Sequence, residues 1–269
     1  MLRVGVVGAA GRMGRTTCAA VQAADDMELV CAVDPAAAGQ DLSELLDGPS
    51  PALAVNDGVE ALAAAKVDVA VDFTTAAGIG ERLEWYASHG VHAVVGTSGI
   101  PPSEVERARE LFERSSANAV IAPNFAVGAA LLTRFCELAA PVMDGVEIVE
   151  LHHDAKLDAP SATSLHTAER IAQAREASGA GPFAADPTAE VNLESVRGGL
   201  GPSGIRVHSV RLPGLVAHEE VIFGAAGQTL TIRHDSFDRR SFMPGVLLAV
   251  RRVGGRPGLT VGLGPILGP

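Results

Sequence analysis

The 269-residue chain carries a net charge of −11, with 47% hydrophobic and 20% charged residues. This balance is typical of a globular protein, long enough for two modest domains, and it excludes the class of disordered chains. Because no basic stripe is available to neutralise phosphates, we expect neither a nucleic-acid partner nor an anionic membrane surface.

The cysteines and the start of the chain predict a reducing compartment. Cys18, Cys31 and Cys136 are odd in number, lie in apolar runs and lack metal-ligand spacing, so we expect buried thiols, no disulfide framework and no metal site. The chain begins directly with a strand-like run in place of a signal peptide, and no apolar run reaches the ~20 residues of a membrane span. We therefore expect a cytoplasmic protein.

A glycine-rich turn follows the first predicted strand. The valine-rich run 2–7 leads directly into Gly8-Ala-Ala-Gly-Arg-Met-Gly14 and then into a helical pattern. Strand, glycine turn and helix in this order are typical of a dinucleotide site, because glycines let the backbone approach a pyrophosphate at the helix N-terminus. The Gly-x-x-Gly-x-x-Gly spacing differs by one residue from the commoner fingerprint, so the turn alone is a weak signal.

The second predicted strand, 28–33, ends at an acidic residue, Asp34. A carboxylate at this place in a nucleotide-binding fold accepts hydrogen bonds from the adenosine ribose. Pro35 follows it and no arginine stands ready for a 2′-phosphate, which favours NADH over NADPH, although Arg12 could partly substitute. The alternative is that Asp34 is a solvated turn residue.

Further strands at 67–74, 91–98 and 119–125 alternate with helical patterns, the last of which begins near Pro101. This alternation predicts a doubly wound, Rossmann-type parallel sheet. The segment 36–66, with a polar turn at 47–51, is a connection whose detail the sequence does not determine. Because the carboxyl ends of parallel strands line the cofactor crevice, these residues are expected to face the dinucleotide: Phe73, Thr74, Gly96, Thr97 and Ser98.

The second half of the chain has a different pattern. An apolar helix at 127–140, a strand at 146–152 and a helix to about 177 precede a Gly-, Ala- and Pro-rich surface loop at 178–203. Strands at 205–212, 217–224 and 228–234, separated by turn signals, predict antiparallel hairpins and hence an α+β domain with a mostly antiparallel sheet. Such an open sheet commonly pairs with copies of itself. A helix at 241–253 and a strand at 258–263 are expected to return to the first domain.

The stretch ELHHDAKLDAPSATS at 150–164 concentrates the chemistry of the chain, because it combines two imidazoles, a helix start and Lys156, one of only two lysines. Pro160 is expected near the first turn of the helix. The N–H groups of Ser161, Ala162 and Thr163 could hold one carboxylate while Lys156 holds another or donates a proton. The pattern indicates a small anionic substrate. The alternative is a simple helix cap after a strand that ends in ordinary polar residues.

Several blocks resemble the 4-hydroxy-tetrahydrodipicolinate reductase family, also called dihydrodipicolinate reductases. They are GAAGRMG, VDFT, GTSG, APNFAVG, ELHHDAKLDAPSATS and RHDSFDRRSFMPGVLLAVR. The resemblance covers nearly the whole chain, and the HHxxKxDAPS block is highly specific. It implies a dinucleotide-binding domain of residues 1–125 completed by 236–269, and a substrate-binding and tetramerisation domain of residues 126–235. It also implies NADH- or NADPH-dependent reduction of a cyclic dicarboxylate in lysine and diaminopimelate biosynthesis, by a homotetramer.

The resemblance also implies roles for single residues. His152 would be the proton donor and Lys156 a second one, and the substrate contacts would be His153, Ser161, Ala162 and Thr163. Ala162 stands where the family usually has glycine, and Pro35 stands where members that bind a 2′-phosphate have arginine. The nucleotide contacts would be Gly8, Ala9, Ala10, Gly11, Arg12, Met13, Asp34, Gly96, Thr97, Ser98, Ala122, Pro123, Asn124 and Phe125.

Two other functions stay open. One is a paralogous reductase of another cyclic imino acid, which the methyl group of Ala162 makes conceivable. The other is a nucleotide-sensing regulator that kept the fold and lost catalysis. Fold alone does not separate these functions. The set of His152, His153, Lys156 and Thr163 disfavours the regulator, because a pure sensor has no need of an acid–base pair.

Overall fold

The structure is a computed structural model and describes residues 1–46, 51–194 and 196–268. The chain divides into two compact units. Unit 1 consists of Met1–Val127 and Arg239–Pro269, and unit 2 of Gly128–Asp238. The chain therefore passes from one unit to the other twice, near the predicted domain limits at 125 and 235. The roles assigned to the two domains stay predictions.

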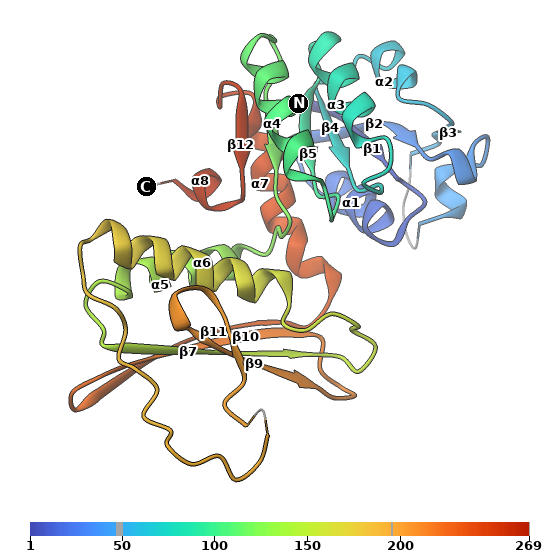
Figure 1. The fold of residues 1–269 in the computed structure, drawn as a ribbon. Coiled ribbons are helices and arrows are strands. Elements are labelled where there is room, and N and C mark those ends of the chain that lie inside the picture. Colours follow the sequence, from blue (N-terminus) through green and yellow to red (C-terminus); the bar gives the residue numbers. More distant parts are fainter. Residues whose placement is uncertain (47–50, 195, 269) are drawn as a thin grey trace. The chain divides into compact units, whose positions relative to one another are not determined.

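In its described part, unit 1 is built on a seven-stranded parallel sheet with the order β3-β2-β1-β4-β5-β6-β12 (Figure 1). The sheet confirms the predicted doubly wound fold. Its strand order reverses between β1 and β4, the point where open α/β sheets form their ligand crevice. The strands are β1 Leu2–Val7, β2 Met27–Val33, β3 Val55–Asn56, β4 Val69–Asp72, β5 His92–Val95, β6 Ala119–Ile121 and β12 Leu259–Val261.

The last strand comes from the end of the chain, since β12 pairs in parallel with β6. The prediction that the final strand returns to the first domain is therefore confirmed. Asn118 links the two segments further, because its amide donates to the carbonyls of Val253 (3.1 Å) and Gly254 (3.0 Å).

Helices pack against this sheet, and α1 contacts α7 while α3 contacts α4. The α4 helix begins with a proline because the first helical position has no intrahelical partner for an N–H group. In the predicted connection 36–66, positions 47–50 of the polar turn lie outside the described residues. The helices are α1 Arg12–Gln22, α2 Glu60–Ala64, α3 Ile79–Ser88, α4 Pro102–Glu113, α7 Met243–Val253 and α8 Gly264–Leu267, with 3-10 turns η1 Pro35–Ala37, η2 Leu42–Glu44 and η4 Arg239–Phe242.

Asp72, at the end of β4, is fully buried. Its Oδ1 accepts hydrogen bonds from the Thr74 amide (3.0 Å) and hydroxyl (2.6 Å), and its Oδ2 accepts from Arg82 Nε (2.9 Å) and the Tyr86 hydroxyl (2.9 Å). A buried carboxylate is tolerated only with such compensation. These bonds tie the carboxyl end of β4 to α3 and so fix the position of this strand end.

Unit 2 has a five-stranded sheet with the order β11-β10-β7-β9-β8. Helices α5 and α6 lie on one face of this sheet (Figure 1). The sheet is mixed and mostly antiparallel, since β9 alone runs parallel to its neighbour β7 among the pairs in the described residues. The elements are α5 Val127–Ala139, β7 Gly145–His152, α6 Ala162–Ala177, β8 Gly199–Leu200, η3 Pro202–Gly204, β9 Arg206–Arg211, β10 Ala217–Ala225 and β11 Gln228–Ser236.

The predicted hairpin between 205–212 and 217–224 is wrong. β7 lies between β9 and β10, and His152 of β7 is in register with Arg211 on one side and Ala217 on the other. The Pro213-Gly214 turn therefore carries the chain around the end of β7. Turn residues mark where a strand ends, but they do not determine which strand it pairs with.

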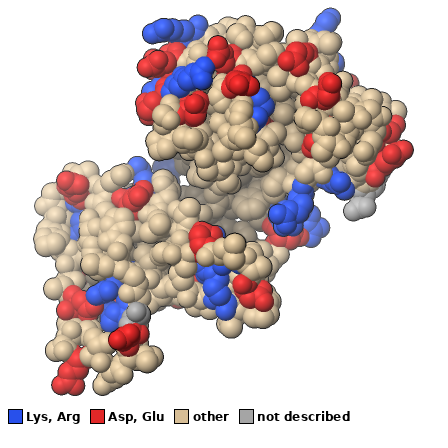
Figure 2. Space-filling view, turned by 45° about the vertical axis from the view of Figure 1, so that its right-hand side comes forward, with Lys and Arg blue, Asp and Glu red and all other residues tan. Residues whose placement is uncertain are grey.

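The three cysteines are buried and free, as predicted. None of the helices in the described ranges is both long enough and apolar enough to cross a membrane. Acidic and basic side chains are mixed on the face that Figure 2 displays.

We expect Asp72→Ala to lower the free energy of unfolding by about 3–5 kcal/mol, because the variant leaves the buried Tyr86 hydroxyl and the partly buried Arg82 Nε without their acceptor. Trp85, the single tryptophan, lies in α3 and reports on unit 1 by fluorescence during urea unfolding. Asp26→Ala is the control, because it breaks an exposed ion pair with Arg251 (2.7 Å) that is expected to contribute little. Equal urea midpoints for the two variants would contradict the structural role of Asp72.

Candidate active site

Two glycines in the turn of unit 1, Gly8 and Gly14, leave no room for a side chain. Gly8 has a positive φ of 80°, and a Cβ on Gly14 would lie 1.9 Å from the Gly8 carbonyl oxygen. The α1 helix starts at Arg12 without a side-chain cap. The N–H groups of its first turn therefore remain available for the oxygen atoms of an anion.

Asp34 holds this turn in place. Its Oδ2 accepts a hydrogen bond from the Ala10 amide at 2.9 Å, and its Oδ1 accepts one from the Ala36 amide at 3.0 Å. An ionised carboxylate has about four acceptor positions, so Asp34 can still accept from a ribose hydroxyl. The next residue, Pro35, begins η1 and supplies no cation.

The other predicted nucleotide residues lie along the carboxyl ends of β4, β5 and β6. A Cβ on Gly96 would lie 2.1 Å from the Phe73 ring, so that ring packs directly on this glycine. The rings of Phe73 and Phe125 meet edge to face with centroids 5.9 Å apart. A Cβ on Gly8 would lie 3.2 Å from the Thr74 side chain, which places the glycine turn beside the end of β4.

Some of these residues have buried side chains and stabilise the strand ends without being accessible to a ligand. Ala9, Thr97, Ala122 and Phe125 are buried, so their side chains pack inside unit 1. Asn124 uses its side-chain oxygen to accept from the Ala126 amide at 2.8 Å. Residues whose side chains reach solvent are Arg12, Ser98 and Pro123. An open helix start, two crowded glycines and the Asp34 carboxylate bound to the same turn fit a dinucleotide.

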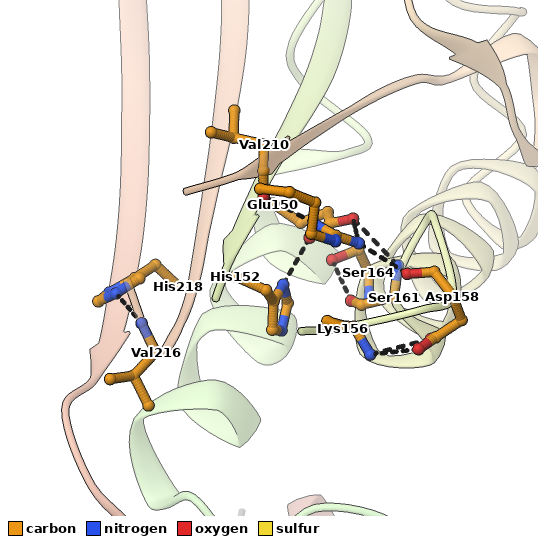
Figure 3. A network of polar contacts seen from close by, with 10 residues as sticks. Glu150, His152, Lys156, Asp158, Ser161, Ser164, Val210, Val216 and His218 are labelled. Atoms are coloured by element: carbon orange, nitrogen blue, oxygen red, sulfur yellow. Dashed lines mark hydrogen bonds and ion pairs between the residues drawn. The ribbon is translucent and has the colours of Figure 1, made fainter. Parts of the chain in front are cut away.

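In unit 2, β7 places Glu150 and His152 on the same face of the sheet, because alternate residues of a strand point the same way. The Glu150 side chain is fully buried and that of His152 is 15% exposed. His152 Nδ1 lies 2.5 Å from Glu150 Oε2, and Figure 3 shows the ring turned toward this carboxylate. Burial lowers the pKa of His152 below its usual value, although Glu150 acts in the opposite direction.

Arg211, from the neighbouring strand β9, compensates the charge of Glu150. Its two terminal nitrogens donate to Oε2 and Oε1, both at 2.8 Å, and Nη2 also donates to the Asp158 carbonyl at 2.7 Å. Burial alone would raise the pKa of Glu150, but hydrogen bonds from Arg211, Ser209 and His152 bring it below the usual value. Glu150 is therefore ionised.

Glu150 and Arg211 were not among the sequence-based site residues. An acidic residue two positions before a histidine on a strand is a signal that could have identified Glu150. The contact of Arg211 with Glu150 depends on the parallel pairing of β9 with β7, whereas the turn signals predicted a hairpin between β9 and β10.

Lys156 lies in the loop that follows β7. Its ammonium donates to both carboxylate oxygens of Asp158 at 2.8 and 2.9 Å, as Figure 3 shows. The hydrogen bond from Lys156 lowers the pKa of Asp158. His153 is exposed at the start of this loop. Because Asp158 is itself exposed, a ligand carboxylate can share or replace this ion pair.

The start of α6 differs in part from the prediction. Helix α6 begins at Ala162 and Ser161 is its N-cap, accepting from the Ser164 amide at 3.2 Å. Pro160 lies near the first turn, as predicted, but directly before the cap and so outside the helix. The Ser161 amide donates to Glu150 Oε1 at 3.3 Å and so is not free for a ligand. Ala162 is exposed and Thr163 is half-buried, so these two residues present the open end of the helix.

Among residues 1–46, 51–194 and 196–268, no group of three or more His, Cys, Asp or Glu side chains is arranged to hold a metal ion. The candidate residues fall into two sets. Unit 1 carries the glycine turn, Asp34 and the strand ends, and unit 2 carries His152, His153, Lys156 and the start of α6.

The family models and the relatives that match this chain all carry the name of the same reductase. The family model described as "Dihydrodipicolinate reductase, N-terminus" matches residues 2–125, and "Dihydrodipicolinate reductase, C-terminus" matches residues 128–267. A 4-hydroxy-tetrahydrodipicolinate reductase of Nocardia farcinica is 48% identical over 99% of this chain and 98% of its own. One of Streptomyces coelicolor is 47% identical over 97% of this chain and 96% of its own.

A solved structure agrees with these relatives. The dipicolinate-bound dihydrodipicolinate reductase of Paenisporosarcina sp. TG-14 superposes with a TM-score of 0.87 at 38% identity and covers 99% of both chains. The resemblance expected from the sequence motifs is thereby confirmed. The chain belongs to the dihydrodipicolinate reductase family of oxidoreductases.

Proposed function

We propose that the protein reduces 4-hydroxy-tetrahydrodipicolinate to tetrahydrodipicolinate with NADH or NADPH, in lysine and diaminopimelate biosynthesis. The observation that carries the proposal is the grouping of His152, Lys156 and the open start of α6 around the end of β7. The names of its full-length relatives and the dipicolinate bound to a structural neighbour support it.

The substrate is a ring with two carboxylates, and unit 2 offers two kinds of carboxylate partner. The Lys156 ammonium provides a point charge, which here is balanced by the exposed Asp158. The first N–H groups of α6, at Ala162 and Thr163, lie at the positive end of the helix dipole and can donate to a carboxylate. His153 is the third proposed contact. Ser161 holds the cap and supports this surface without offering its own amide.

In this proposal His152 donates a proton to the substrate, and Lys156 is a second proton donor. When bound, the reduced nicotinamide supplies the hydride. The 4-hydroxyl group must also leave as water, so the overall change consumes one hydride and one proton, and an imidazole is a suitable proton donor near neutral pH. Because burial lowers the pKa of His152, the residue releases its proton more readily than a solvated histidine does.

The nucleotide contacts are proposed at the glycine turn (8–13), Asp34, and the strand ends carrying Phe73, Thr74, Gly96–Ser98 and Ala122–Phe125. The Asp34 carboxylate and the uncharged Pro35 favour NADH, because a 2′-phosphate there would meet a negative charge and no cation at position 35, although Arg12 of the glycine turn could partly substitute. A cytoplasmic homotetramer, formed through the open sheet of unit 2, completes the proposal.

One spectrophotometric assay tests the function. The pathway intermediate is generated by the preceding synthase, and oxidation of NADH and of NADPH is followed in parallel. Dipicolinate, added as a substrate mimic, is expected to inhibit competitively with the intermediate. If neither nucleotide is oxidised at micromolar enzyme, the protein does not carry out this reaction.

We expect His152→Ala and Lys156→Ala each to lower kcat by about 100-fold or more, the usual contribution of a positioned acid. Far-UV circular dichroism checks that both variants fold. The matched controls are His208→Ala, on β9 outside this site, and Lys66→Ala, the other lysine of the chain. Wild-type turnover in either site variant would refute the role assigned to that residue.

We expect Pro35→Arg to lower the KM for NADPH by roughly 10-fold, because a guanidinium at this place can pair with the 2′-phosphate. The KM for NADH should change little, and it serves as the internal control in the same preparation. An equal change in both KM values would show that residue 35 does not distinguish the 2′-phosphate of NADPH from the 2′-hydroxyl of NADH.

A further inference from the structure

Every group within hydrogen-bond distance of the buried Glu150 carboxylate is able to donate a hydrogen bond to it. Arg211 gives two N–H bonds, the Ser161 amide gives one, and His152 Nδ1 approaches Oε2 at 2.5 Å. An ionised carboxylate has no proton to give. The hydrogen between Glu150 and His152 must therefore belong to Nδ1, and in the neutral imidazole Nε2 is then the nitrogen without a proton.

We propose that Glu150, with Arg211 as its counter-ion, is the positioning residue of the reaction: it fixes the His152 ring and tautomer so that Nε2 exchanges the proton with the substrate. The inference rests on the proposed function, since it concerns the donor named there. Glu150 does not touch the substrate, and it acts through His152. A buried carboxylate that orients a histidine in this manner also stabilises the imidazolium form.

The groups near Glu150 include cations and a second carboxyl group, and the ion pair with Arg211 keeps Glu150 ionised. Arg211 faces it from β9, Lys156 lies in the loop beside His152, and Glu219 occupies the register position opposite Glu150 on β10. Burial raises the pKa of Glu219 to about 7, and Arg211 makes no hydrogen bond to it in the described residues. Of the two neighbouring carboxyl groups, Glu219 is therefore the one that takes up a proton near neutral pH.

The same strand carries a matched trio away from the site. Glu147 Oε2 lies 2.7 Å from His208 Nε2, and Arg197 pairs with Oε1 of the same carboxylate. Glu147 is partly exposed, so solvent shares its compensation. Glu147→Gln thus removes the same type of Glu–His–Arg contact from β7 without touching His152.

The test compares Glu150→Gln with Glu147→Gln. Glutamine keeps the shape of the side chain but can present an N–H to Nδ1, which selects the wrong tautomer. We expect kcat of Glu150→Gln to fall by about 100-fold or more, with the KM for the nucleotide unchanged. Glu147→Gln should retain wild-type kcat. Similar kcat values for the two variants would overturn the proposal.

The pH profile distinguishes positioning from a general loss of stability. His152 donates in its protonated form, so turnover falls as pH rises through its pKa. Removing the negative charge of Glu150 lowers that pKa, and the alkaline limb of kcat should move to lower pH in any residual activity. Because Glu219 also titrates near neutral pH, the profiles are repeated with Glu219→Gln, in which the His152 limb should persist. An unmoved limb in Glu150→Gln contradicts the proposal.

A second readout needs no turnover. ¹⁵N NMR of histidine-labelled wild-type protein, with His152 assigned from the His152→Gln variant, should show Nδ1 protonated and Nε2 unprotonated in the neutral ring. This result decides the tautomer even if Glu150→Gln fails to fold, and a neutral ring protonated at Nε2 overturns the proposal. If the wild-type protein shows no turnover, the proposed function is refuted. If the wild-type protein is active and Glu150→Gln has the same kcat, only the positioning role of Glu150 is refuted.

Discussion

The constraint that governs both units is the cost of removing a carboxylate from water. An unpaired buried charge is so unfavourable that its neighbours must supply donors from several elements at once. Asp72 collects donors from the segment after β4 and from α3, and Glu150 collects them from β9 and the start of α6. Each acid thereby fixes the end of a central strand, where the candidate functional residues lie.

Glu150 also links structure to chemistry. The bonds that compensate its charge order the surroundings of His152, because Arg211 binds both the carboxylate and the carbonyl of Asp158, which belongs to the same loop as Lys156. The His152 ring, the Lys156 ammonium and the start of α6 are thus held by one connected set of hydrogen bonds. Such a network is specific because every member must be satisfied at the same time.

An acidic protein that binds an anionic ligand has to create local positive potential, and this chain does so mainly with backbone groups. In unit 1 the start of α1 has open N–H groups beside Gly8 and Gly14, where a side chain has no room. In unit 2 the start of α6 presents Ala162 and Thr163, and Lys156 adds a single charge that pairs with Asp158. Peptide dipoles provide this potential without changing the net charge of the chain.

The sequence by itself determined the features that local physics encodes. The glycine turn, the valine-rich strands and the HHxxKxDAPS block predicted a Rossmann-type unit, an α+β unit and the residues that surround His152. Only the tertiary structure decided that β9 pairs with β7, that Arg211 neutralises Glu150, and that the Ser161 amide is already used. The physical reason is that periodicity and turn residues report on neighbours along the chain, whereas strand order and the partner of a buried charge depend on contacts between residues far apart in the sequence.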